Sequence, residues 1–445
     1  WGRFLSQYGV RSERTSNDSV EVSPEVSVPF EHPDVRVIVD TMFLEGALQP
    51  VGTRDSPTDL PEWVKVGLVE DPNALGNLVS EGVRRIADDL PDANATHRDW
   101  IELARRLGEV ISRFNSLSTE IAEPIQEHIR KLQRDADERL RDWLVQHYAD
   151  LPSLPAAKGP VMVHHVPRYL ALRRNAGEER VALLVFDGLA LDQWFQIRER
   201  LTARLPGFSA EEGGCFAWLP TLTSVSRQAL FSGLKPREFS NSIESTSQEP
   251  SLWARFWQEN GLRKPEIVYQ RGLKRTEQLA ELEDAISRPA TRVAGIVVDM
   301  VDEIVHGAML GKRGIAGQIN AWCETGFVEK LFLLLAEQGY QIYLTADHGN
   351  VDAEGIGRLS QGVVSELSGE RVRTYRSETL AASVPSEIDA FRFDSPGLPP
   401  DFLPVYAGTR GAFVPKGDQI VAHGGISVEE LIVPFIKMNI KRPAS

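Results

Sequence analysis

Cysteine is nearly absent from this chain, which contains two cysteines, Cys215 and Cys323, among 445 residues. Two cysteines cannot build the disulfide framework of a small secreted domain, so we expect a reducing, cytoplasmic environment. Long apolar runs are also missing, because none approaches the roughly 18 residues that a membrane-spanning helix needs. No signal peptide is visible either. These absences exclude a disulfide scaffold and argue against a membrane partner.

Positive charge is scarce as well, since 49 Lys and Arg residues face 63 Asp and Glu residues and give a net charge of −14. This balance argues against broad nonspecific binding of nucleic acid, which requires basic surface. It leaves room for a local basic groove, and it suits a protein that concentrates cations. The hydrophobic fraction of 42% is that of a globular protein, long enough for about two or three domains. Because the chain begins with Trp1, we expect a fragment of a longer protein.

The N-terminal third divides into an arm and a helical region. Residues 1–32 are rich in Ser, Glu and Val and predict a linker or loosely docked arm, and residues 34–40 predict a short strand. Apolar residues within 100–111 and 125–148 recur at spacings of three and four, with charged residues on the opposite face. We interpret both stripes as the core of a helical bundle and assign 33–175 to a mainly helical N-terminal region.

Beyond residue 180, strand-like and helix-like segments alternate, which is typical of a parallel α/β sheet. The predicted strands are 181–187, 266–270, 293–299 and 340–346, and the predicted helices are 190–204, 224–232, 251–260, 276–287 and 315–338. The stretch 356–410 is rich in Ser, Pro, Gly and Arg, and we interpret it as an insertion over the active-site face. The apolar run 431–436 resumes the fold, so we predict one domain over 176–440.

The first candidate site residue is Asp187, which follows six apolar residues, 181–186. A continuous apolar run of this length predicts a strand buried on both faces. A carboxylate at its end must meet solvent, a cation or a metal, because burying an unpaired charge is costly. Ligands of open α/β sheets bind at the carboxyl ends of the strands. We therefore expect the chemistry to start at Asp187, although an Asp here could also simply cap the next helix.

A second candidate is the segment 220–227, which carries the hydroxyls of Thr221, Thr223, Ser224 and Ser226 and leads into a predicted helix. A hydroxyl at a helix N-terminus faces unpaired N–H groups and the positive end of the helix dipole. Both features favour a developing alkoxide and an incoming phosphate. The alternative is ordinary N-capping.

Two further clusters contain acids next to histidines. Asp302 and His306 are four residues apart, so they share a face of one helical turn, and both are common zinc ligands. The alternative is a polar pair on a helix surface. Asp347 and His348 follow a predicted strand, where a loop can aim them at two different metals. Finally, His423 precedes two glycines; a lone histidine of this kind is usually structural.

Together these clusters resemble the alkaline phosphatase superfamily, in the order Asp, Thr, Asp-x-x-x-His, Asp-His-Gly and a late His. The Pro-Thr-x-Thr spacing that ends at Thr223 is similar to the nucleophile segment of nucleotide pyrophosphatase/phosphodiesterases. The resemblance implies an α/β fold with an alkaline-phosphatase-like core, a mainly parallel sheet flanked by helices. It also implies that Thr223 is the catalytic nucleophile. The implied metal ligands are Asp302, His306 and His423 for one ion, and Asp187, Asp347 and His348, bridged to Thr223, for the other.

A narrower resemblance covers more of the chain. Residues 136–151, 165–170, 187–188 and 424–434 look like those of PglZ proteins, the phosphatase-like components of BREX phage-defence systems. This resemblance implies that the partners are other BREX components, among them a methyltransferase, an ATPase and small subunits. PglZ proteins are usually longer, which agrees with a fragment.

The expected activity is metal-dependent phosphoester hydrolysis with two divalent ions. Zinc suits mixed His and carboxylate ligands, and Mn²⁺ is the alternative. Attack by Thr223 would give a phospho-threonine that water then hydrolyses. We expect a diester or nucleotide substrate, with a nuclease as the form relevant to defence.

Arginines are expected to bind the phosphate. Arg227 lies one helical turn beyond Thr223, and Arg373 with Tyr375, flanked by Arg371 and Arg376, lies in the insertion, where Tyr375 could stack on a base. The alternative for the insertion residues is that they are solvated loop side chains. A rival function is a metal-binding scaffold of the BREX complex with little or no turnover. A sulfatase is disfavoured, because Cys215 lies outside the nucleophile segment.

Overall fold

The computed structural model describes residues 2–5, 29–44, 48, 51–53, 60–65, 68–70, 73–205, 207–307, 311–359, 362 and 369–440. The chain divides into two compact units, one formed by Trp1–Glu81 with Thr119–Ile121 and the other by Gly82–Ser118 with Ala122–Ser445. Most of the predicted arm over 1–32 lies outside the described residues. No helix in the described part of the chain has the length and apolarity to cross a membrane.

The first unit contains short elements around a small apolar core of Phe4, Leu5, Phe30, Val39, Leu60 and Val64. Its described elements are α1 (Gly2–Leu5), α2 (Pro33–Arg36), α3 (Val39–Leu44), β1 (Val51–Thr53), α4 (Glu62–Lys65) and β2 (Leu68–Glu70), and β1 pairs in parallel with β2. The prediction of a strand over 34–40 is wrong, because α2 and α3 occupy it. Pro33 presets a helical φ at the first position of α2, and His32 caps the helix by accepting a hydrogen bond from the Asp34 N–H.

The second unit is built on a six-stranded sheet in the order β4-β14-β7-β3-β6-β5. Its strands are β3 (Val181–Phe186), β4 (Phe208–Phe216), β5 (Ile267–Leu273), β6 (Val293–Val298), β7 (Gln341–Thr345) and β14 (Ile432–Ile440). β7, β3, β6 and β5 are parallel, and β14 runs antiparallel to both of its neighbours. The predicted α/β class with a mainly parallel sheet is confirmed. β4 was not predicted, because it lacks an apolar run.

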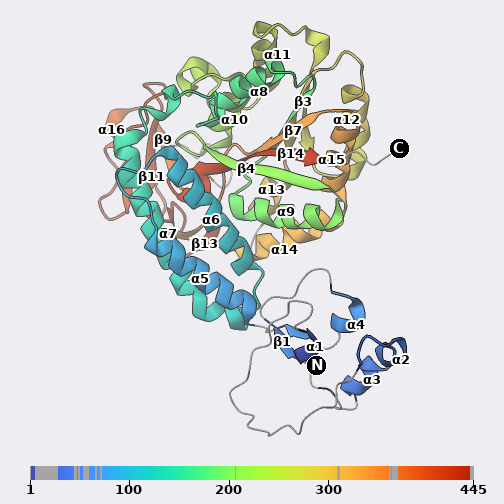
Figure 1. Cartoon of the computed structure of the whole chain (residues 1–445). Helices are drawn as coiled ribbons and strands as arrows, with labels where there is room; N and C mark the ends of the chain where they lie inside the picture. The colour runs from blue at the N-terminus through green and yellow to red at the C-terminus, as the bar shows by residue number, and fades with distance from the viewer. Residues whose placement is uncertain are drawn as a thin grey trace. The chain divides into compact units, whose positions relative to one another are not determined.

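Helices cover both faces of the sheet (Figure 1). Phe186 of β3 packs against Trp322 of α14 (Gly311–Glu324) and Phe332 of α15 (Phe327–Glu337). A Cβ on Gly295 of β6 would lie 2.9 Å from Trp253 of α11 (Glu249–Glu259). Gly295 is the register partner of Leu183, three residues from Phe186, so the two positions point to opposite faces. Hence α11 covers one face and α14 and α15 cover the other.

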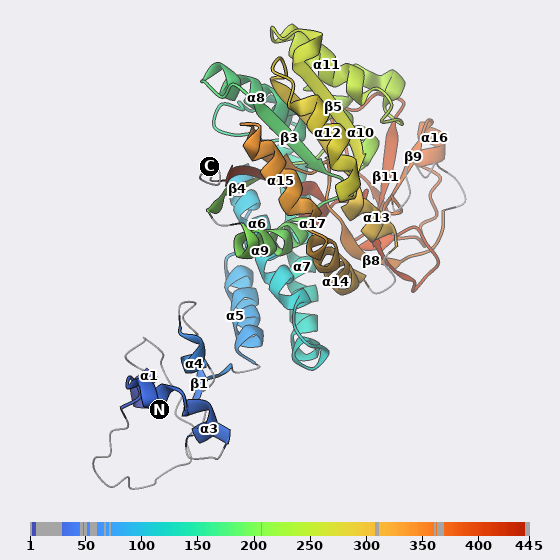
Figure 2. The same ribbon diagram turned by 90° about the vertical axis from the view of Figure 1, so that its right-hand side faces the viewer.

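The structure describes further α-helices, one of which, α12, lies side by side with α15 (Figure 2). They are α5 (Ala74–Asp88), α6 (His97–Asn115), α7 (Thr119–His147), α8 (Val166–Asn175), α9 (Leu191–Arg204), α10 (Thr223–Ser232), α12 (Leu279–Ile286), α13 (Met300–His306), α16 (Glu378–Ala381) and α17 (Val428–Leu431). The single helix predicted over 315–338 is divided between α14 and α15 at Gly326, whose φ of 75° is left-handed.

The compact unit that holds the sheet also contains α6 and most of α7. Their predicted apolar stripes face inward, and the rings of Trp100 and Trp143 lie 5.9 Å apart. α6 approaches α9 so closely that a Cβ on Gly108 would lie 2.8 Å from the Leu191 side chain. Through this contact with α9, α6 is packed directly on the α/β core.

The segment predicted as an insertion forms a small antiparallel sheet in the order β10-β11-β9. Its described elements are β9 (Val372–Tyr375), α16, β10 (Ala390–Arg392) and β11 (Leu403–Ala407). Beside it in the chain, β8 (Val351–Gly355) pairs with β12 (Gly411–Ala412) and β13 (Gln419–Ala422). These two small sheets carry the chain from β7 back to β14.

Candidate active site

The carboxyl ends of three neighbouring parallel strands bring acidic side chains together. Asp187 follows β3, Asp347 follows β7 and Asp299 follows β6. Because the order of these strands is β7-β3-β6, their ends meet at one edge of the sheet. One ligand atom from each of Asp187, Asp347 and His348 lies within 4.8 Å of the others, and all three residues are buried. This group is a candidate metal site.

Two carboxylate oxygens of the group, Asp187 Oδ1 and Asp347 Oδ2, are buried without a hydrogen-bond partner among the described residues. The other oxygen of Asp347 accepts hydrogen bonds from the backbone N–H groups of Gly188 and His348, each at 3.1 Å. The other oxygen of Asp187 accepts one from Arg227. Leaving a buried carboxylate oxygen unpaired is costly, and a divalent cation would satisfy both. The donor set therefore fits a metal ion.

Charge within the group is unequally distributed. Burial disfavours ionisation of Asp187, but the positive charge of Arg227, with His348, outweighs it and lowers the pKa of Asp187 below its ordinary value. Burial and the adjacent charge of Asp187 raise the pKa of Asp347 well above its ordinary value. Two adjacent buried carboxyls resist ionising together unless a cation compensates them.

Thr223 lies beside this group, at the first position of α10. His348 Nδ1 lies 2.9 Å from the Gly349 carbonyl and donates to it, so Nε2 is an acceptor in the neutral ring. The Thr223 hydroxyl lies 2.9 Å from that Nε2. The hydroxyl thus sits at the positive end of a helix and next to a predicted metal ligand. A Cβ on Gly349 would lie 1.9 Å from the Glu429 carbonyl oxygen, so this turn requires glycine.

Two of the neighbouring hydroxyls, those of Thr221 and Ser226, bond to the backbone. Ser226 Oγ accepts a hydrogen bond from the Trp218 N–H at 3.0 Å. Thr221 Oγ1 accepts from the Gly424 N–H at 2.9 Å and donates to the Gly425 carbonyl at 3.0 Å. These contacts turn Thr221 and Ser226 to the backbone, whereas the Thr223 hydroxyl lies beside His348.

The second predicted group of ligands adjoins the first. Asp302 Oδ2 lies 3.0 Å from His306 Nε2 on α13, and this bond raises the pKa of His306. A Cβ on Gly188 would lie 3.6 Å from the His348 ring and 3.7 Å from Asp302 Oδ1, so both side chains border the same turn. The ring of His423 stacks on His348 at 4.0 Å. Among the described residues, however, Asp302, His306 and His423 do not form a three-ligand group of the kind that Asp187, Asp347 and His348 form.

Arg227, predicted to bind substrate, is buried between two carboxylates, Asp187 and Glu249. Glu249 also accepts a hydrogen bond from the Tyr269 hydroxyl. Sequence reasoning missed Glu249 and Tyr269, because each is an isolated polar residue in a segment without a motif.

The predicted insertion residues belong to the sheet β10-β11-β9. Arg373 donates to the carbonyls of Val372 at 2.8 Å and Phe413 at 3.2 Å. Tyr375 lies in the apolar core of that sheet with Ala381 and Val405. These contacts place both side chains inside the insertion.

A buried ion pair supports the loop that carries His423, and sequence reasoning missed it. Glu430 accepts hydrogen bonds from the Gly425 N–H at 2.9 Å and from Arg371 Nε at 3.0 Å. Arg371 also donates to the Gly411 carbonyl at 2.7 Å. No local pattern announces this contact, because 59 positions separate Arg371 from Glu430.

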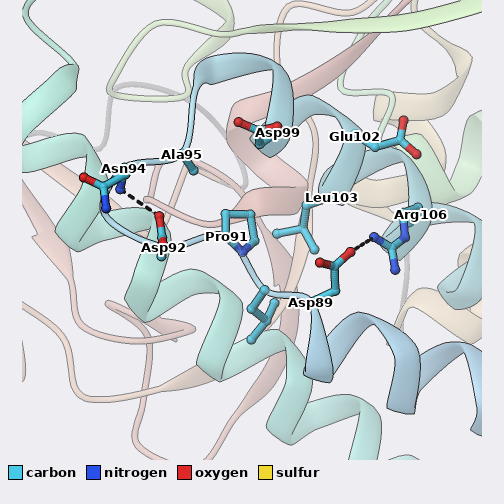
Figure 3. Close-up of a pocket in the computed structure, with 10 residues that line it drawn as sticks. Asp89, Pro91, Asp92, Asn94, Ala95, Asp99, Glu102, Leu103 and Arg106 are labelled. Carbon is cyan, nitrogen blue, oxygen red and sulfur yellow. Dashed lines mark hydrogen bonds and ion pairs between the residues drawn. The ribbon is translucent and has the colours of Figure 1, made fainter.

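A pocket of about 370 Å³ lies elsewhere in the second unit, at the connection between α5 and α6 (Figure 3). Its polar groups have local partners: Arg106 pairs with Asp89 at 2.6 Å, and Asp92 accepts from the Asn94 N–H at 2.8 Å. These local pairs stabilise the connection between α5 and α6, so we do not interpret the pocket as a functional site.

One comparison with known proteins identifies a family. A family model described as the BREX system PglZ alkaline phosphatase-like domain matches residues 170–438, more than half of the chain. A search of curated proteins gave no match.

Solved structures with a similar fold include three of ectonucleotide pyrophosphatase/phosphodiesterase 5. The murine protein, as an inactive variant in complex with AMP, is 11% identical with a TM-score of 0.43, over 58% of this chain and 88% of that chain. A second murine structure is 13% identical with a TM-score of 0.40 and the same coverage. The human structure is 11% identical with a TM-score of 0.40, over 58% and 87% of the two chains.

Proposed function

This chain belongs to the PglZ family of BREX alkaline phosphatase-like domains, and we propose that it is a metal-dependent phosphoester hydrolase of a BREX phage-defence system. The observation that carries the proposal is the pair of buried oxygens, Asp187 Oδ1 and Asp347 Oδ2, that lack partners in the described part of the chain. These oxygens belong to the candidate metal group, which also contains His348. The Thr223 hydroxyl lies beside His348. Burial and the neighbouring Asp187 raise the pKa of Asp347, so a bound cation would allow both carboxyl groups to ionise together.

In the proposed reaction Thr223 is the nucleophile. Its hydroxyl lies 2.9 Å from His348 Nε2, the ring nitrogen that is left to hold a metal, and the N-terminus of α10 stabilises negative charge on the attacking oxygen and on the phosphoryl group. A divalent metal, when bound, would neutralise charge on the phosphoryl oxygens and lower the pKa of coordinated hydroxyls. Attack by Thr223 on the ester phosphorus would break one P–O bond and release that alcohol, which takes up a proton, and water would then hydrolyse the phosphoryl group left on Thr223.

We propose that the site holds two divalent ions, with zinc favoured and Mn²⁺ as the alternative. Asp187, Asp347 and His348 would hold one ion, and their distances support this assignment most directly. Asp302, His306 and His423 would hold the other, since they border the first group. Thr223 would face both.

We propose a diester or nucleotide substrate, including nucleic acid, and other BREX components as partners. Arg227 could reach a phosphate only by rearranging its contacts with Asp187 and Glu249. Phosphate recognition is therefore expected to depend mainly on metal and on the α10 N-terminus. Both cysteines are free and buried, and we place the protein in the cytoplasm.

The test is turnover of bis-p-nitrophenyl phosphate and p-nitrophenyl phosphate after EDTA treatment and after addition of Zn²⁺ or Mn²⁺. We expect metal to restore activity, with the diester preferred. Thr223→Ala should retain metal but lose at least about a hundredfold in turnover, as for loss of a covalent step. Thr223→Ser should keep part of the activity, because the hydroxyl remains.

Ser224→Ala is the matched control, since it removes a hydroxyl from the adjacent position. It should change the rate little. If Ser224→Ala is inactive and Thr223→Ala is not, Thr223 is not the nucleophile. If the parent protein and all variants bind metal and are equally inactive, the protein is a metal-binding scaffold of the BREX complex.

A further inference from the structure

Glu249 and Tyr269 are joined to the candidate metal site by a chain of buried hydrogen bonds. Arg227 donates through Nε to Glu249 Oε1 at 2.8 Å and through Nη1 to Asp187 Oδ2. The Tyr269 hydroxyl donates to Glu249 Oε2. Glu249 is fully buried. The chain connects β5, α11, α10 and the end of β3, four elements that meet only in the folded molecule.

The arginine fixes the orientation of the Asp187 carboxylate toward the other ligands. Asp187 Oδ2 is held by Arg227, while Oδ1 has no partner among the residues that the structure describes. The two oxygens are chemically equivalent, so a half-turn of the carboxylate would restore the same ion pair, whereas any smaller rotation would weaken it. Arg227 therefore presents Oδ1 in the orientation that the group with Asp347 and His348 requires.

The same arginine also opposes a metal, because a guanidinium next to Asp187 repels a divalent cation bound there. Charges interact strongly at this depth, since the site is screened little by water. Glu249 offsets this repulsion by pairing with the other side of the guanidinium. Tyr269 holds the second oxygen of Glu249 and so keeps its carboxylate turned toward Arg227.

We propose that Glu249 and Tyr269 are positioning residues that set the metal affinity of Asp187 through Arg227. Neither contacts the three ligands of the candidate site in any described hydrogen bond, so they act through the arginine. The inference rests on the metal site of the proposed function and not on phosphoester hydrolysis itself.

The test is the Zn²⁺ affinity of Glu249→Gln, measured by competition with a chromophoric chelator. We expect dissociation constants about 10- to 100-fold weaker than those of the parent, as for other residues that orient metal ligands. Tyr269→Phe should weaken binding less, because the Glu249 charge remains.

The chain supplies a matched control in a second Tyr–Glu–Arg group. Glu178 accepts from Tyr343 at 2.8 Å and from Arg173 Nε at 3.0 Å. It precedes β3, at the opposite end of that strand from Asp187. Glu178→Gln should leave Zn²⁺ affinity unchanged, and an equal loss in this variant would overturn the inference.

The double variant Arg227→Gln with Glu249→Gln separates charge from simple structural support. Removing both charges should restore Zn²⁺ binding above that of Glu249→Gln, whereas a purely structural role predicts no recovery.

Thermal unfolding without metal verifies folding, and if Glu249→Gln does not fold, Tyr269→Phe and the double variant decide. Parent-like affinity in folded Glu249→Gln, or no recovery in the double variant, overturns this inference alone. A parent that binds Zn²⁺ without hydrolysing phosphoesters overturns the proposed function alone.

Discussion

Two buried clusters of charge in the second unit differ in how completely their oxygens are paired. The closed cluster consists of Asp137, Asp192, Lys312, Arg410 and Glu429. All three of its carboxylates have both oxygens hydrogen-bonded, chiefly to Lys312 and Arg410. The open cluster consists of Asp187, Asp347, Glu249 and Arg227, where three carboxylates face one guanidinium and two oxygens lack partners in the described structure.

The difference separates an architectural role from a chemical one. The closed cluster joins α7, α9, α14 and α17 and holds helices of the N-terminal half against the α/β core. The open cluster holds two adjacent carboxyl groups with unmatched oxygens at the ends of β3 and β7, where a cation would allow both to ionise. Burial and charge density alone do not identify a site; the unmatched oxygens do.

The largest expected effect comes from removing a ligand of the open cluster. Asp347→Ala should lose bound metal and reduce turnover by at least about a thousandfold, or roughly 4 kcal/mol of barrier. His306→Ala should behave similarly. Folding should suffer only modestly, because Asp347 follows the end of β7 and His306 is the last residue of α13. Elemental analysis of the purified variants checks the assignment, and normal metal occupancy in both would contradict it.

Substitutions in the closed cluster should lower the stability of the fold and not primarily the turnover. Lys312→Met removes a buried cation and leaves Asp192 and Glu429 without its hydrogen bonds. We expect the free energy of unfolding to fall by about 3–5 kcal/mol. Lys274→Met is the control, because Lys274 pairs with Glu303 at a partly exposed position, worth about 0–1 kcal/mol. Equal losses measured by chemical denaturation would remove the distinction between buried and exposed pairs.

A third buried group consists of two neutral histidines, His164 and His165. It extends the comparison, because its contribution to stability should depend on pH. Burial lowers the pKa of His165 from 6.5 to about 4, and burial with His165 nearby lowers the pKa of His164 to about 2. The folded state resists the proton that the unfolded chain accepts, so stability is full above pH 6.5 and falls as pH drops toward 4. For His165 the loss should reach about 2–3 kcal/mol.

Chemical denaturation at pH 7.5 and pH 4.5 measures this loss. His165→Asn keeps an acceptor for the Met162 N–H but cannot be protonated, so the difference between the two pH values should shrink. His128→Gln, at an exposed position of α7, should leave the difference unchanged. An unaltered pH dependence in His165→Asn would show that another group controls it.

The smallest effect is expected at an exposed insertion arginine. Arg376 pairs with Glu244 at 2.7 Å and Asp401 at 2.9 Å on the surface. Arg376→Ala should cost about 0–1 kcal/mol of stability and leave diester turnover within about twofold. A tenfold rise in KM for the diester would instead place this arginine in substrate binding.

The local sequence pattern was sufficient to predict the strands at the centre of the sheet. Four predicted strands correspond to β3, β5, β6 and β7. β3, β6 and β7 were found because their residues are nearly all buried and mostly apolar, whereas β5 is a partly exposed edge strand. The same runs located Asp187 and Asp347, since polar residues directly after such strands must leave the core. The strand predicted over 34–40 failed because Pro33 favours a helix start, which a short apolar alternation does not reveal.

What the sequence by itself determined was therefore the set of strand ends and the chemistry of the residues that follow them. Only the tertiary structure decided which isolated polar residues meet. Asp137 and Arg410 are 273 positions apart, and Glu249 meets Arg227 only where α11 packs on α10. The physical reason is that a strand or helix records its burial in its own periodicity, whereas an ion pair between elements leaves one unremarkable residue in each.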